Sequence, residues 1–230
     1  MYFTEKNLTR FNNISYTYFL NPSQINKIKS KIKDNNCLIY YPYKDSEKNI
    51  LYRGDIPKVI LYEIKSKISL RHQDILGTLY SLNIADDLFG DILIINNHYY
   101  IYILPILRNY LESNFTSLKN SRIELEEIDV DILSDYKRSY EDIEIIVSSN
   151  RIDTVVSAII HSGRNNISNL VKKKEIILNY EYLKKTDYKL RENDVFSIKR
   201  VGKFKYVGII KNTKSNHYII KLFKYIKKKI

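Results

Sequence analysis

The alternation of apolar patterns between Pro57 and Ile128 is the feature that most constrains the fold. It predicts strands at 58–64, 91–95, 99–104 and 122–128, and helices at 70–82 and 105–118. Asn96-Asn97 separates the two central strands, where a tight turn needs residues that tolerate positive φ. The resulting order, βαββαβ, is typical of a ferredoxin-like domain, an architecture that RNA-recognition domains also use.

A less regular segment precedes this domain. Asn21-Pro22-Ser23 indicates the start of a helix, whose inner face would carry Ile25, Ile28 and Ile32. Residues 38–43 (LIYYPY) predict a strand that Pro42 interrupts. The lysines on the outer side of the helix, Lys27, Lys29, Lys31 and Lys33, are interpreted as a solvated face.

Positive charge is concentrated in the last part of the chain. The whole chain has a net charge of +12. Residues 151–230 contain 20 Lys or Arg against 6 Asp or Glu, whereas the first 150 residues contain 18 against 20. Such asymmetry points to a polyanionic partner for the C-terminal part, with a lysine-rich solvated surface as the alternative.

Two short helices open this basic part. Apolar residues from Ile152 to Ile160 recur at helical spacing, and Gly163 ends that helix. The next helix places Ile167, Leu170 and Val171 inward and gathers cations and amides on its outer face, which favours phosphate contacts. The predicted RNA-binding residues are Arg151, Arg164, Asn165, Ser168, Asn169, Lys172, Lys173, Lys174, Arg200, Lys203 and Lys205.

Strand patterns follow the two helices. They are predicted at 175–179 and 194–199, and an additional strand with a cationic outer side is predicted from Val201 onward. Residues 221–229 mix lysines with apolar side chains, which leaves a fraying helix and an RNA-touching arm as alternatives. Between Glu124 and Glu144 the chain is acidic, and this connector would repel phosphate.

The arrangement of residues 151–204 resembles the S-four RNA-binding domain. The resemblance rests on Arg-Ile-Asp at the start of a helix, an Arg just after its end, a strand ending in Asn, and an Asn-Asp turn before a final strand. Three positions depart from the usual pattern. Gly163 replaces a Ser, the Gly before the first strand is replaced within 172–174, and Asn193-Asp194 replaces Gly-Asp. Asn tolerates positive φ better than most residues, so the last change is mild.

The stretch RHQDILGTLYSLNIADDLFGDILI, residues 71–94, resembles the YlmH family of bacterial S-four proteins. Leu76-Gly77 and Gly90-Asp91-Ile92 match that family's pattern, as does Phe19-Leu20-Asn21-Pro22 more weakly. The predicted fold is therefore α+β, with a small N-terminal domain (1–56), a ferredoxin-like middle domain (57–140) and a C-terminal S-four domain (141–230). The resemblance implies binding to the large ribosomal subunit carrying peptidyl-tRNA, in rescue or quality control of stalled translation.

Several kinds of chemistry have no support in the sequence. A single cysteine, Cys37, excludes an intramolecular disulfide and a cysteine-based zinc cluster, and no glycine-rich phosphate loop or His-x-x-x-His motif occurs. We expect structural roles for the polar residues of the middle domain, which are His72, Asp74, Asp86, Asp87 and Asp91. The tyrosines at 99, 100 and 102 are expected to pack against protein and not against bases.

The sequence therefore predicts a non-catalytic protein that binds structured RNA, with ribosomal RNA and possibly tRNA in its partner set, and without a metal or a small-molecule cofactor. We expect a cytoplasmic protein, because no secretion signal or membrane-spanning apolar run is found. We also expect it to be a monomer. Two alternatives stay open. One is an RNA-modifying enzyme of the pseudouridine synthase or methyltransferase type, and the other is a protein adaptor linked to cell division.

Overall fold

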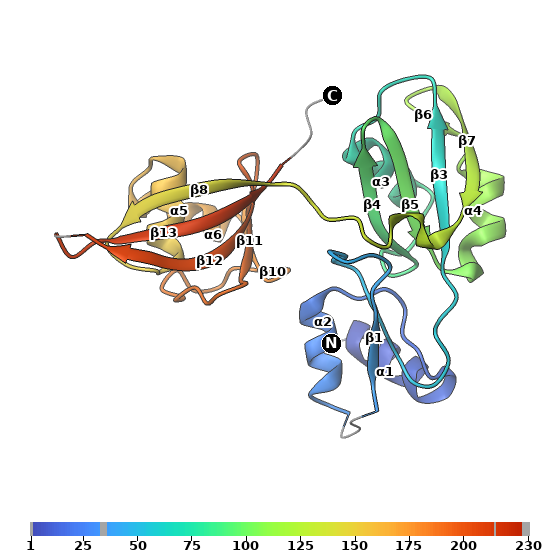
Figure 1. The fold of residues 1–230 in the computed structure, drawn as a ribbon, viewed down its shortest axis with the longest axis horizontal. Coiled ribbons are helices and arrows are strands. Elements are labelled where there is room, and N and C mark those ends of the chain that lie inside the picture. Colours follow the sequence, from blue (N-terminus) through green and yellow to red (C-terminus); the bar gives the residue numbers. More distant parts are fainter. Residues whose placement is uncertain (1, 33–35, 214, 227–230) are drawn as a thin grey trace. The chain divides into compact units, whose positions relative to one another are not determined.

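The structure is a computed structural model that describes residues 2–32, 36–213 and 215–226 (Figure 1). It is a mixed α+β protein with three antiparallel sheets, which confirms the predicted class. The chain divides after Lys137 into two compact units, each described by itself below. Among the helices of the described ranges, none is long and apolar enough to cross a bilayer.

The N-terminal unit begins with four elements: α1 (Tyr2–Ile14), α2 (Pro22–Lys29), β1 (Leu38–Tyr40) and β2 (Ile50–Tyr52). Helix α2 starts as predicted, because Asn21 and Gln24 form a capping box that satisfies backbone N–H groups at its first turn. Ile25 and Ile28 are buried on its inner face. Strands β1 and β2 pair antiparallel.

The predicted βαββαβ order is present in the middle of the chain. The elements are β3 (Ile60–Ser66), α3 (His72–Ser81), β4 (Phe89–Ile95), β5 (His98–Ile103), η1 (Pro105–Leu107), α4 (Arg108–Asn114), β6 (Ser117–Leu118), β7 (Ser121–Ile128) and η2 (Val130–Leu133). The sheet order is β4-β5-β3-β7-β6, so the first strand of the motif lies between the third and the fourth. The second helix is shorter than predicted, because residues 117–118 pair with β7 across a turn in which Lys119 and Asn120 adopt positive φ.

The two faces of this sheet are both covered. On one face, Ile60, Tyr62 and Ile64 of β3 pack with α3 and α4 in the main core. On the other face, Leu61, Leu93 and Tyr102 pack against residues of the N-terminal segment, which are Phe19, Tyr43 and Ile50. The ring of Tyr102 is fully buried and stacks at 5.9 Å on that of Tyr43. The expected packing role of Tyr102 is therefore confirmed.

The C-terminal unit comprises β8 (Tyr140–Val147), α5 (Ile152–Ile160), α6 (Arg164–Lys172), β9 (Ile176–Leu178), β10 (Glu181–Tyr182), β11 (Val195–Ile198), β12 (Gly202–Asn212) and β13 (Tyr218–Tyr225). Its sheet order is β10-β9-β11-β12-β13-β8. One face of the sheet contributes Phe196, Phe204 and Leu222 to a core that also contains Val155 of α5 and Ile167 of α6. In Figure 1 the strands β8, β13 and β12 lie in front of the two helices.

Residues 218–225 form a strand, so the helix predicted from Lys221 onward is wrong up to Tyr225, and these residues do not form a separate arm. Whether they touch RNA stays a prediction, and residues 227–229 lie outside the described ranges. The physical reason is a backbone ladder on each side, because β13 pairs with β12 and also with β8. The last five residues of the acidic connector, 140–144, belong to β8. Two of its carboxylates pair with lysines of β13, Asp142 with Lys221 at 2.6 Å and Glu141 with Lys224 at 3.2 Å.

Candidate nucleic-acid interface

Helix α6 presents a polar outer face. Gly163 occupies the N-cap position with an extended backbone, and Ile167 is fully buried beneath the helix. Ser168, Asn169 and Lys172 are exposed, as the helical spacing predicts. The side chains of Arg164 and Asn165 lie outside the part of the chain that the structure describes, so their contribution stays a prediction.

The end of α6 carries two more of the predicted cations. Lys173 is the C-cap residue and is exposed, and Lys174 follows with a φ of 55°. This is the turn in which the S-four pattern places a glycine, and Lys174 here adopts the left-handed backbone that glycine favours. Its Nζ lies 5.7 Å from the ring centroid of Tyr182 on β10.

Arg200 lies beside this helix end, although it is distant in sequence. Strands β9 and β11 pair antiparallel, and the backbone N–H of Lys199 donates to the carbonyl of Glu175 at 2.9 Å. The turn after β11 therefore lies next to the residues that follow α6. Arg200 is exposed in that turn. We call the resulting group the α6 cluster, which comprises Ser168, Asn169, Lys172, Lys173, Lys174 and Arg200.

Charge in the α6 cluster is available to a ligand. Within the described residues, Lys172, Lys173 and Arg200 have no acidic side chain within salt-bridge distance. The nearby Lys199 differs, because its Nζ lies 3.4 Å from Glu175. Unpaired lysine and arginine side chains on one surface are the groups that bind backbone phosphates.

Arg151 is engaged within the protein. Its guanidinium makes two hydrogen bonds to the buried carboxylate of Asp153, at 2.7 and 3.1 Å. Burial alone would raise the pKa of Asp153, but the hydrogen bond from Arg151 outweighs it and the net pKa lies below the usual value. The contacts of this region are with the 186–189 segment, since Ile152 N–H donates to the carbonyl of Tyr188 at 2.8 Å. Arg151 thus holds the start of α5 in place, and a phosphate contact by it stays a prediction.

Lys203 and Lys205 lie on a different surface from the α6 cluster. The alternation of β12 sends Phe204 and Tyr206 into the core and these two lysines to the opposite face of the sheet. Lys203 Nζ lies 5.0 Å from the ring of Tyr180 and 4.9 Å from that of Tyr225. Sequence reasoning missed these aromatic partners, although the alternation of Lys221, Phe223 and Tyr225 was a visible signal.

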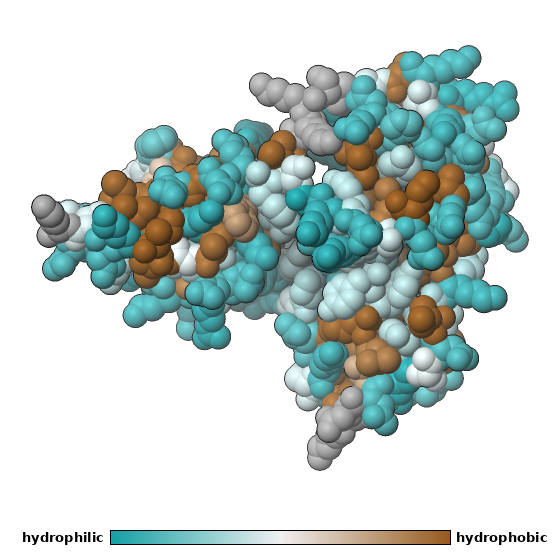
Figure 2. Space-filling view, viewed as in Figure 1, coloured by the Kyte–Doolittle hydropathy of each residue, from teal (hydrophilic) through white to brown (hydrophobic). Residues whose placement is uncertain are grey.

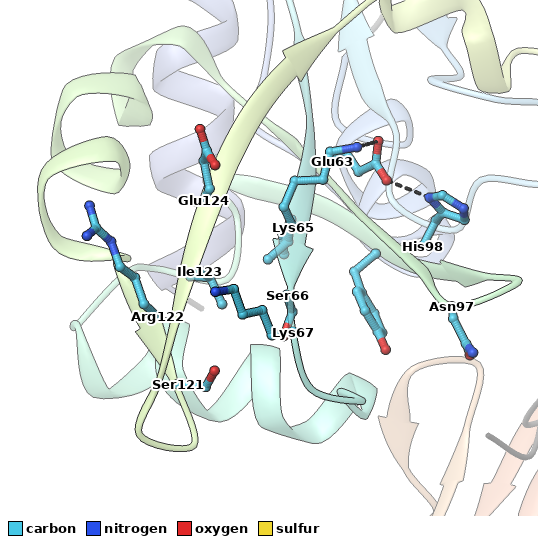
Figure 3. A pocket seen from close by; sticks show the side chains of 12 residues that line it. Glu63, Lys65, Ser66, Lys67, Asn97, His98, Ser121, Arg122, Ile123 and Glu124 are labelled. Atoms are coloured by element: carbon cyan, nitrogen blue, oxygen red, sulfur yellow. Dashed lines mark hydrogen bonds and ion pairs between the residues drawn. The ribbon is translucent and has the colours of Figure 1, made fainter.

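A polar pocket of about 600 Å³ lies on the middle sheet, between the end of β3, the β4–β5 turn and the start of β7 (Figure 3). Glu63 lies between Lys65 and His98, at 2.6 Å from each. Burial alone would raise the pKa of Glu63, but hydrogen bonds with Lys65 and His98 outweigh it and keep its pKa below the usual value. Lys65 also pairs with Glu126 at 3.0 Å. The carboxylate of Glu63 is therefore compensated by Lys65, within a pocket whose lining also includes Lys67 and Arg122.

The carboxylates of the middle domain serve separate structural contacts. Asp74 accepts hydrogen bonds from the backbone and the guanidinium of Arg71, both at 2.8 Å, and Lys119 lies at 2.5 Å. The bond from Arg71 is the main reason that the pKa of Asp74 is held well below its usual range. Asp86 pairs with Lys48 at 2.9 Å. No group of three or more His, Cys, Asp or Glu side chains in the described ranges is placed to hold a metal ion.

Residues 58–132, which span the βαββαβ motif, match the family described as "Putative RNA-binding domain in YlmH". The resemblance to the YlmH family is thus confirmed. A solved structure, the cell division protein ylmH from Streptococcus pneumoniae, is similar at 20% identity with a TM-score of 0.45, covering 55% of this chain and 87% of that one. No curated protein matches the chain.

The YlmH-like pattern has a physical basis in this structure. A Cβ on Gly90 would lie 2.9 Å from Phe19 Cε1, so the two matching stretches around these residues are in direct contact. Asp91 accepts hydrogen bonds from the hydroxyl of Tyr43 at 2.6 Å and from the backbone N–H of Glu47 at 2.7 Å. In the YlmH-like domain, Gly90-Asp91 therefore attaches the N-terminal segment to the sheet.

Proposed function

We propose that this protein binds structured RNA without altering it, and that the α6 cluster is the main contact. The observation that carries the proposal is the set of exposed, unpaired cations that two distant segments bring to one end of the C-terminal unit. The match of residues 58–132 to a YlmH RNA-binding domain supports the same class of partner. The family resemblance extends the proposal to ribosomal RNA, on the large subunit during rescue or quality control of stalled translation.

The binding mode follows from the charges and amides. Lys172, Lys173, Lys174 and Arg200 would contact backbone phosphates, and the polar side chains of Ser168 and Asn169 would add hydrogen bonds. Helical RNA presents phosphates and 2′-hydroxyls more readily than base edges, so recognition would be mostly of shape. Neutralising about four phosphates gives a slope of roughly −3 to −4 for log K against log salt concentration.

The test is co-sedimentation with purified ribosomal subunits over a range of salt concentrations. The proposal predicts salt-sensitive pelleting with the large subunit, together with RNA that is recovered unmodified by mass spectrometry. Lys172→Glu combined with Lys173→Glu should abolish pelleting at moderate salt. A matched control is Lys29→Glu combined with Lys31→Glu, which changes the net charge equally at exposed positions of the N-terminal unit.

The control pair separates a site from a general charge effect. If both double variants lose binding to the same extent, net charge alone explains the interaction and the α6 cluster is not the site. If neither variant changes affinity or its salt slope, the assignment is also wrong. Modified nucleotides appearing in the RNA after incubation would instead support the enzyme alternative.

A further inference from the structure

The face of the C-terminal sheet that α5 and α6 leave uncovered carries an aromatic cluster with lysines between the rings. We define it as the outer face, by the residues Tyr140, Tyr180, Lys203, Lys205, Phe223 and Tyr225. All six are partly exposed. Figure 2 shows hydrophobic and hydrophilic residues side by side on the part of the surface where β8, β13 and β12 face the viewer.

The rings of the outer face form one continuous set. Tyr140 stacks on Phe223 with ring centroids 5.5 Å apart and an interplanar angle of 27°. The same ring meets Tyr225 edge-on at 5.0 Å. Lys203 then links Tyr225 to Tyr180, with its Nζ about equally distant from the two rings. Register explains this continuity, because Tyr225 is paired with Tyr140 and Phe223 with Lys205 across neighbouring strands.

Charge is distributed unevenly across the same face. On the β8 side, Asp142 neutralises Lys221 at 2.6 Å. On the β12 side, Lys205 has no acidic partner among the described residues, and Lys203 contacts two rings. A negatively charged backbone would therefore follow β12, while flat groups attached to it would reach the rings of β13 and β8.

We propose that the outer face binds unpaired nucleotides by stacking their bases on its tyrosines, with phosphates held by Lys203 and Lys205. Aromatic side chains interleaved with cations are the recurring platform for single-stranded nucleic acid. A purely apolar protein partner fits less well, because it would bury the ammonium group of Lys205, which has no acidic partner among the described residues. Along the chain, the turn between β11 and β12 joins the two surfaces, because Arg200 of the α6 cluster precedes Lys203 by only three residues.

This inference rests on the proposed function, since it adds a single-stranded site beside a site for helical RNA. The RNA would then be a hairpin with an unpaired extension, its stem on the α6 cluster and its extension on the outer face. The extension should raise affinity, because each stacked base contributes about 5- to 150-fold to binding.

The experiment measures fluorescence anisotropy with two labelled RNAs, a blunt hairpin and the same hairpin with an extension of about eight nucleotides. Wild-type protein should bind the extended hairpin at least tenfold more tightly. Tyr140→Leu combined with Tyr225→Leu should abolish that difference and leave the blunt hairpin unaffected. Tyr140→Phe combined with Tyr225→Phe keeps the rings and should bind as wild type.

Circular dichroism checks that the leucine variants are folded. A second measurement uses only wild-type protein, in which 4-thiouridine in the extension should cross-link to peptides of β12 or β13. Equal binding of both hairpins by wild type overturns the inference while leaving the proposed function intact. Failure of wild type to bind either RNA overturns the proposed function. Unchanged extension binding by the leucine variants, without cross-links to these strands, would mark the outer face as a protein-contacting surface and refute the inference.

Discussion

Replacing Gly90 with alanine would add one methyl group where the N-terminal segment packs on the middle sheet, and the effect would show how tightly that contact is packed. An alanine Cβ there would lie 2.9 Å from Phe19 Cε1 and 3.0 Å from Tyr102 Cβ. Carbon atoms pack best at about 3.5–4.0 Å. The Phe19 ring could shift, but Tyr102 Cβ is attached directly to the backbone of β5, opposite the register shift between Phe89 and Ile92.

The magnitude follows from two opposing effects of Gly90→Ala. Overpacking a core in this way costs about 1–3 kcal/mol. The smaller conformational freedom of alanine in the unfolded chain offsets about 0.4–1 kcal/mol of this. We therefore expect the free energy of unfolding of the N-terminal unit to fall by about 1–2 kcal/mol, a five- to thirtyfold change in its folded to unfolded ratio.

The assay is urea unfolding followed by hydrogen exchange of peptides from β4 and β5, which reports on this unit alone. Gly77→Ala is the matched control, because nothing outside the backbone of its own helix and its two chain neighbours lies within 4 Å of the place that its new methyl group would occupy, and Gly77 is exposed in the middle of α3. That change should stabilise the unit by about 0.5–1 kcal/mol. Adding Phe19→Leu to Gly90→Ala should cost less than the sum of the single changes. Equal effects of the two alanine substitutions, or strict additivity with Phe19→Leu, would refute the packing argument.

Three further predictions concern single positions. Gly163→Ser should raise the free energy of unfolding of the C-terminal unit by about 0.5–1 kcal/mol in thermal unfolding, because the N-cap backbone suits Ser and the site is open; a loss would contradict it. Lys174→Gly should remove the cost of a left-handed backbone at a residue with a Cβ and so stabilise the unit by about 1 kcal/mol. The same substitution should lower RNA affinity, and an unchanged affinity would count against the α6 cluster as the RNA-binding site. The pKa of Asp74 is lowered in the folded state by Arg71, so its contribution is present above its ordinary pKa and is lost as pH falls through the folded value. In urea unfolding, the loss of unfolding free energy caused by Asp74→Asn should therefore be constant above about pH 5 and shrink below pH 4. A loss that stays constant at low pH would contradict a stabilising pairing of Asp74 with Arg71.

The fold of the middle domain was predictable because its signals are local. Apolar residues there recur every 2 residues in the strands and every 3.6 residues in the helices, over segments long enough to tell the two apart. The structure places these elements in the predicted order. Strand β2 was missed, since three residues from Ile50 to Tyr52 carry no periodicity. The strand at 218–225 was missed for another reason, because its lysines gain partners only from β8, which is distant in sequence.

The candidate site likewise contains residues that could be assigned from the sequence and residues that only the structure brings together. The outer face of α6 follows directly from helical spacing, so Ser168 and Lys172 could be assigned from sequence. The pairing of Arg151 with Asp153 depends on how deeply the carboxylate is buried, which spacing does not reveal. The position of Arg200 next to the turn after α6 depends on the ladder between β9 and β11, and the aromatic set of the outer face depends on the register between β13 and β8.

The pairing of β8 with β13 also has a consequence for how the protein is made. Strand β8 leaves the ribosome first, and the strand that completes its ladder follows only after residues 148–217 have been synthesised. At roughly 5–20 residues per second, β8 waits several seconds for its partner. Its exposed Ile146 and the acidic residues beside it are then in solution together, and those carboxylates would discourage pairing with other nascent chains. The sheet of the C-terminal unit is therefore completed late in translation, when its last strand, β13, pairs with its first, β8.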